Sequence, residues 1–135
     1  MVAKAILGSV ILCARLTASA QSCVEVFEGA LSADSPAYVV AFRTLPAAIE
    51  VGRHFIVELI VYPKAGPGAA DVVRVDAFMP EHGHGMNYKA AVIPLGAGRY
   101  CAEGLMFHMP GRWDFIFDVR AAGKTERLNC SVVVH

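Results

Sequence analysis

Apolar and polar residues alternate with a period of two through much of the chain after residue 36. Every second residue from Phe55 to Val61 is apolar. The same holds from Trp113 to Val119, with Asp114 and Asp118 on the opposite side. Such alternation is typical of a β-strand with one buried and one solvated face. No convincing amphipathic helix follows residue 20, so the sequence predicts an all-β domain.

Clusters rich in Pro and Gly divide this region into seven candidate strands. The clusters lie at 63–68, 80–87, 94–98, 110–111 and 123–124. The expected strands are Ala37–Arg43, Arg53–Tyr62, Asp71–Met79, Lys89–Ile93, Arg99–Leu105, Arg112–Arg120 and Thr125–Val134. Seven short strands within about 100 residues are typical of an immunoglobulin-like antiparallel β-sandwich, which is the fold we predict.

The first 20 residues predict a secretory signal peptide, whose helix would precede the sandwich. Lys4 gives the basic start, residues 5–14 the apolar core, and Ala18-Ser19-Ala20 the cleavage site. The apolar run is shorter than the roughly 20 residues that span a membrane. We therefore expect a periplasmic or secreted protein, with an uncleaved N-terminal anchor as the alternative.

Cleavage would leave two parts and no membrane span. Residues 21–36 are expected to form an extended N-terminal arm, with Val24–Phe27 as a candidate short strand. Residues 37–135 are expected to form the sandwich. Loss of Lys4 and Arg15 leaves 10 basic against 12 acidic side chains, a net charge of −2. With no basic run, nucleic-acid binding is not expected.

Three cysteines remain after cleavage, Cys23, Cys101 and Cys130. In an oxidising compartment, one disulfide and one free thiol are the simplest account. We favour Cys23–Cys130, because the N-terminal arm often pairs with the last strand of such sandwiches. A Cys101–Cys130 bridge is the competitor, and a third option makes Cys101 a metal ligand.

The segment His82-Gly83-His84-Gly85-Met86 is the most unusual stretch of the chain. In extended conformation its two imidazoles and one thioether point the same way, and the glycines let the backbone bend. Imidazole suits copper, zinc, nickel and iron, whereas thioether sulfur selects copper, above all Cu(I). The alternative is structural: His82 satisfies a turn, and both glycines serve positive φ angles.

A second segment, Met106-Phe107-His108-Met109-Pro110-Gly111, offers another imidazole and two thioethers. If each strand reverses the direction of the one before, loops 44–52, 80–88 and 106–111 lie at one end of the sandwich. The predicted metal ligands are His82, His84, Met86, His108 and Met109. His54 opens a strand near this end, but we expect it to be a surface residue. Met79 and Met106 are expected to pack rather than bind.

These two segments resemble the signature of the YtkA-like domain family, which is related to FixH-like proteins. The resemblance rests on Asp76–Asn87 and, after it, Gly98–Tyr100 and Glu103–Trp113, and it extends over residues 49–134. It implies a small exported or membrane-anchored bacterial β-sandwich, with links in some members to copper handling and cytochrome oxidase assembly. Unlike FixH-like members, this chain has no clear long membrane anchor.

The expected function is an exported copper-binding or copper-delivery module with a metal-receiving or cell-envelope partner. The alternative is a metal-free interaction domain that uses Met86, Met106, Phe107 and Met109 as an exposed contact patch. An enzyme is not expected, because the sequence carries no nucleophile elbow, HExxH motif or phosphate loop.

Overall fold

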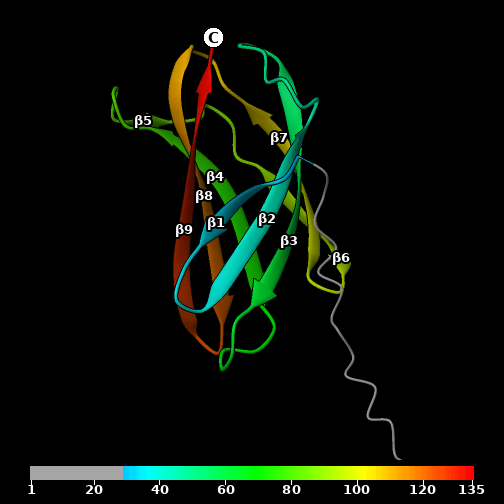
Figure 1. Ribbon diagram of the computed structural model, residues 1–135. Coiled ribbons are helices and arrows are strands. Elements are labelled where there is room, and N and C mark those ends of the chain that lie inside the picture. The colour runs from blue at the N-terminus through cyan, green and yellow to red at the C-terminus, as the bar shows by residue number, and fades with distance from the viewer. Residues whose placement is uncertain (1–28) are drawn as a thin grey trace, which may run out of the picture.

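The computed structural model describes residues 29–135; the signal peptide, Cys23 and the candidate strand Val24–Phe27 lie outside this range. The described residues form two antiparallel sheets packed face to face (Figure 1). One sheet has the order β1-β2-β3-β7-β6, and the other has the order β5-β4-β8-β9. The strands are β1 (Leu31–Asp34), β2 (Tyr38–Leu45), β3 (His54–Pro63), β4 (Val72–Met79), β5 (His84–Gly85), β6 (Ala91–Gly96), β7 (Arg99–Met106), β8 (Gly111–Ala121) and β9 (Lys124–Val134).

The predicted β-sandwich is confirmed, with all seven expected strands within a few residues of their predicted bounds. Two short strands were not predicted. Leu31–Asp34 pairs with β2 from within the expected N-terminal arm, and His84–Gly85 pairs with the end of β4 from within the expected loop. Within residues 29–135, no helix is long and apolar enough to cross a membrane.

The core is a layer of aromatic and branched side chains between the sheets. Every second residue from Trp113 to Val119 is fully buried, as the alternation predicts. The Phe42 ring lies 5.2 Å from Phe115 and 4.8 Å from Phe117, measured between centroids, so β2 and β8 interlock across the two sheets. Burial of one such ring contributes about 1.5–3 kcal/mol relative to an exposed one.

A carboxylate joins the two sheets along one edge of the sandwich. Glu126 on β9 accepts hydrogen bonds from the Ser35 hydroxyl and, at 3.2 Å, from the backbone N–H of Ala37. Ser35 follows β1, which therefore lies beside β9 although the two strands share no ladder. Burial and the nearby Glu126 charge raise the pKa of Tyr38, which keeps this phenol neutral and able to donate to the carbonyl of Gly68.

The structure also bears on the cysteines. Cys101 on β7 and Cys130 on β9 lie in different sheets and are not bonded to each other, so the competing Cys101–Cys130 bridge is absent. Burial raises the pKa of both thiols, which makes them less reactive at neutral pH. The favoured Cys23–Cys130 pairing stays a prediction, because Cys23 lies outside the described residues.

Two hairpins at the end opposite the His/Met segments turn on the same dipeptide. Ala97-Gly98 joins β6 to β7, and Ala122-Gly123 joins β8 to β9. All four residues have φ between 49° and 75°. Positive φ at both central residues defines the type I′ turn, whose twist matches that of the strands it connects. A Cβ on Gly98 would lie 2.8 Å from the backbone oxygen of Val61, so only glycine fits there.

We predict opposite effects for two substitutions in the first of these turns. Gly98→Ala should lower the free energy of unfolding by about 2 kcal/mol or more, because it adds left-handed strain and a clash with the Val61 backbone. Ala97→Asn should raise it by about 0.5 kcal/mol, because Asn tolerates positive φ better than Ala. Urea unfolding of the three proteins measures both. Equal midpoints for Gly98→Ala and the wild type would contradict the assigned turn.

Candidate metal site at one end of the sandwich

Three imidazoles from two separate loops lie in a row at one end of the sandwich. The ring centroids of His82 and His84 are 5.7 Å apart, and those of His84 and His108 are 5.0 Å apart. His84 lies in β5, which pairs with the last two residues of β4, and His108 lies between β7 and β8. The 5.0 Å approach of His84 to His108 confirms that the two His/Met segments meet, as the strand count predicts.

A buried tryptophan forms the floor under this row. Trp113 is fully buried, and its centroid lies 6.0 Å from that of His84 and 5.5 Å from that of His108. Phe107 stacks on the indole at 4.5 Å with an interplanar angle of 2°. The Nε1–H of Trp113 donates to the carbonyl of Met109 at 3.0 Å. One side chain thus holds the second loop to the core and supports two of the imidazoles.

Two imidazole nitrogens have environments that suit ligand binding. The Nδ1 of His84 lies 3.1 Å from the carbonyl oxygen of Gly85. A proton on that nitrogen would be donated to the carbonyl, which leaves Nε2 with a free lone pair. The Nδ1 of His108 is buried and has no hydrogen-bond partner in the described part of the chain. Buried polar atoms are nearly always paired, so this nitrogen points to a missing ligand or proton donor.

The methionines divide into packing residues and residues beside the imidazoles. Met79 is fully buried, as expected, and Met106 is half-buried beside His54. Met86 and Met109 are partly buried against the edge of the core, two residues from His84 and next to His108 respectively. They are therefore close along the chain to the imidazoles that the fold brings together.

The exposed patch expected at this end is wrong, because Phe107 is fully buried and Met86, Met106 and Met109 are partly buried. Phe107 is 0% exposed, because it stacks on Trp113 and packs against Phe55 with centroids 5.0 Å apart. Its neighbours on either side are half-buried rather than exposed. The alternation of β7 continues through Phe107 into the core, and this continuation, rather than surface exposure, explains its apolar character.

Other candidate ligands lie apart from the row. His54 is exposed and packs its ring against Tyr88 at 5.2 Å, and Cys101 lies on β7 next to Glu58 of β3. The Glu81 carboxylate approaches Gly111, 4.0 Å from the position of an added Cβ. Among residues 29–135, no three His, Cys, Asp or Glu side chains are grouped so as to hold a metal ion.

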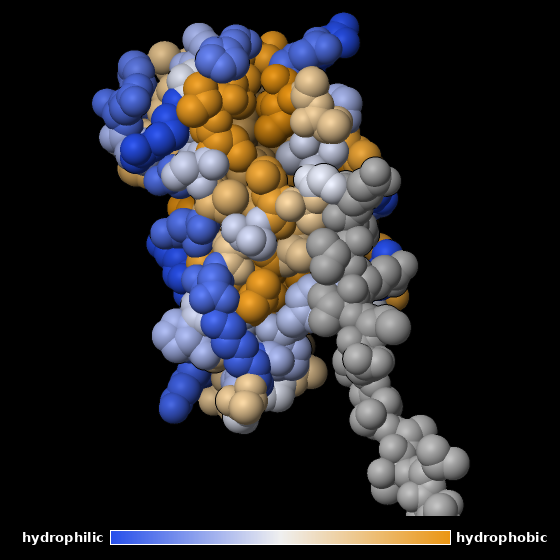
Figure 2. All heavy atoms as spheres, viewed as in Figure 1, coloured by the Kyte–Doolittle hydropathy of each residue, from blue (hydrophilic) through white to orange (hydrophobic). Residues whose placement is uncertain are grey.

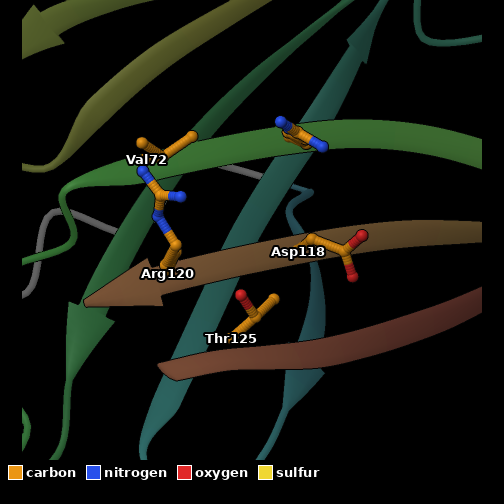
Figure 3. Close-up of a pocket in the computed structure, with 5 residues that line it drawn as sticks. Val72, Asp118, Arg120 and Thr125 are labelled. Atoms are coloured by element: carbon orange, nitrogen blue, oxygen red, sulfur yellow. The ribbon is translucent and has the colours of Figure 1, made fainter. Parts of the chain in front are cut away.

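Concave regions elsewhere on the described surface include an apolar groove and a polar pocket, and neither is lined by His82, His84 or His108. Figure 2 shows apolar side chains gathered on one face. A shallow apolar groove lies where β2 and β9 end, and it is lined by Leu31, Ile49, Val132, Val133 and Val134. On the outer face of the four-stranded sheet, Val72, Arg74, Asp118, Arg120 and Thr125 line a smaller pocket (Figure 3). There the hydrogen bonds from Arg127 lower the pKa of Asp118, so this carboxyl is an ion-pair partner.

Trp113 is the functional candidate that the sequence does not single out. Its place in an alternating strand marks it as a core residue, which it is. Its contacts with His84 and His108 depend on where two loops cross the end of the sandwich. The one available signal is its position five residues after His108, at the start of the strand that follows the second His/Met segment.

A family model and a solved structure are similar to this chain. A family model described as YtkA-like matches residues 33–118. A solved structure of a DUF4426 family protein from Pseudomonas aeruginosa is similar, with 15% identity and a TM-score of 0.49, over 81% of this chain and 98% of that chain. No curated protein matches the chain. The matched range contains both His/Met segments.

We predict that Trp113→Phe changes the NMR signals of His84 and His108 but not those of His135. Both imidazoles lie beside the indole ring, whose ring current shifts their carbon-bound protons, whereas His135 is at the end of the chain. The same change should cost about 2 kcal/mol of stability, through lost volume and a lost hydrogen bond. Proton–carbon correlation spectra and urea unfolding measure the two effects. Unmoved His84 and His108 signals would contradict the arrangement.

Proposed function

We propose that this chain, which belongs to the YtkA-like family, is an exported module that binds copper at the end of the sandwich where His82, His84 and His108 meet. The observation that carries the proposal is the buried, unpartnered Nδ1 of His108 in an imidazole whose ring lies 5.0 Å from that of His84. Copper is here the cargo of the protein, and Met86 and Met109 complete the set of candidate donors.

The spacing of the imidazoles fits a shared ion. Two imidazoles that bind one metal through nitrogens at about 2.0 Å have ring centroids about 5 to 6 Å apart. The two separations along the row, 5.7 and 5.0 Å, both lie in that range. Small rotations of the side chains would therefore suffice to bring neighbouring nitrogens onto one ion.

The donor types favour Cu(I) over zinc. Structural zinc sites close with four Cys, His or carboxylate ligands, whereas His82, His84 and His108, as they stand within residues 29–135, are not grouped so that all three could hold one ion. Cu(I) is stable with few ligands and prefers thioether and imidazole to carboxylate. Two imidazoles with a neighbouring thioether from Met86 or Met109 would satisfy it without a cysteine. Such a site also suits the periplasm, where thiols are prone to oxidation.

A delivery role would require a partner surface near the ion. The apolar groove lined by Leu31, Ile49 and Val132–Val134 lies at the same end of the sandwich as the imidazole row, because β2, β4 and β9 all finish there. It also keeps open the alternative of a metal-free interaction domain. Pull-down from a periplasmic extract with and without a copper chelator separates the two, since only the alternative predicts capture that the chelator leaves unchanged.

We predict that Cu(I) quenches the fluorescence of Trp113, the one tryptophan of the chain. The double variant His84→Ala/Met86→Ala, and separately His108→Ala, should weaken the affinity at least about 100-fold, because each removes donors from the site. His54→Ala is the matched control, since His54 is an exposed histidine at the same end but outside the row. Anaerobic fluorescence titration and calorimetry with Cu(I) and Cu(II) measure the affinities.

Two results would end the proposal. Wild-type affinity no tighter than about micromolar would argue against a copper role. Equal binding by the wild type and by the His84 and His108 variants would place any copper elsewhere. Metal analysis of the protein purified from its native compartment tests the identity of the ion independently.

A further inference from the structure

Exposure changes in one direction along the imidazole row. His82 is exposed, His84 is half-buried, and His108 is half-buried with a fully buried Nδ1. We propose that the three imidazoles have two roles: His84 and His108 hold Cu(I) at rest, and His82 is the exchange ligand that passes the ion to and from an external donor. This inference rests on the proposed copper function, and it divides the histidines of the proposed site into two resting ligands and one exchange ligand.

The backbone of His82 is fixed while its side chain is open to solvent. The N–H groups of His82 and Gly83 both donate to the carbonyl of Met79, at 3.2 and 2.9 Å. Met79 is fully buried, so this turn is attached to the core. Gly83 has φ of +66°, which closes the turn at low cost. The His82 imidazole therefore stands at a fixed point at the solvent end of the row, with only its side-chain torsions free.

An exposed ligand in this place changes the rate of transfer more than the affinity. When copper moves between two ligand sets, it passes through states in which both sets contact it. An imidazole that contacts the ion mainly in those states stabilises the transition state for transfer in both directions. An interaction made in the transition state and not in the resting state alters rates and leaves the equilibrium nearly unchanged.

The structure supplies reasons to separate His82 from the resting ligands. His84 and His108 both pack on Trp113, with centroids at 6.0 and 5.5 Å, so their positions are set by the core. The ring contact found for His82 in this cluster is with His84. Of the three, His82 is therefore the one that a bulky partner or chelator reaches first.

The test compares the affinity for Cu(I) with the rate of its transfer to bicinchoninate, a soluble Cu(I) chelator, by anaerobic stopped-flow absorbance. We expect His82→Ala to keep the affinity within about threefold of the wild type and to slow transfer about tenfold. The rate constant that should decrease is the one that multiplies the chelator concentration in the observed transfer rate. His82→Met, which keeps a soft donor at the same point, should restore transfer, and His54→Ala should change neither quantity.

The possible results are distinct. If His82→Ala weakens binding as much as His84→Ala, His82 is a resting ligand and the inference is wrong. If it changes neither affinity nor transfer rate, His82 is a bystander and the inference is also wrong, while the copper function stands. Failure of the wild type itself to bind Cu(I) would remove the proposed function and this inference together. Thermal unfolding of each variant confirms that the fold is kept.

Discussion

The stacking of Phe107 on Trp113 is the contact on which this end of the molecule depends. The two rings come from opposite sheets, since β7 leads into Phe107 and β8 contains Trp113. They are parallel and fully buried, so they close the core where the strands end. The same indole donates a hydrogen bond to Met109 and contacts two imidazoles. The same contacts therefore pack the core at this end and position the candidate ligands.

A consequence of this arrangement is that the candidate site is rigid on one side and open on the other. A fully buried indole cannot move without loss of core packing, which costs several kcal/mol. The His82 turn is attached to the same core through the Met79 carbonyl, yet its imidazole is exposed. Rigid inner groups and an accessible outer group are what a protein needs if it must hold an ion and also give it up.

The sequence predicts the sandwich well because strand periodicity is a local property. Alternation from Phe55 to Val61 and from Trp113 to Val119 follows directly from burial of one face, and both runs are buried as expected. The sequence does not predict strand β1, because Leu31–Asp34 is short and polar on its outer side. Strand β5 was missed because His84-Gly85 pairs with β4 only through the backbone, which leaves no pattern in the side chains.

The site was predictable to the extent that strand direction decides it. Counting reversals placed the two His/Met segments at one end, and the 5.0 Å approach of His84 to His108 agrees. The support from Trp113 and the burial of Phe107 were not predictable, because they depend on how two loops cross above the core. The loop motif predicts that Phe107 is a surface residue. Only the extension of β7 by one position identifies it as a core residue.

The two Ala-Gly turns fix strand pairing at one end of the molecule, whereas the candidate ligands lie at the other end. Each of these two hairpins has two linking residues and a defined twist, so the pairing of β6 with β7 and of β8 with β9 is fixed there. The connections at the end that carries the imidazoles, residues 46–53 and 107–110 among them, are longer than these two turns. Residues can therefore be inserted or exchanged around His82 and His108 without a shift in strand register. A fold of this kind can change what it binds at one end while the other end preserves its alignment.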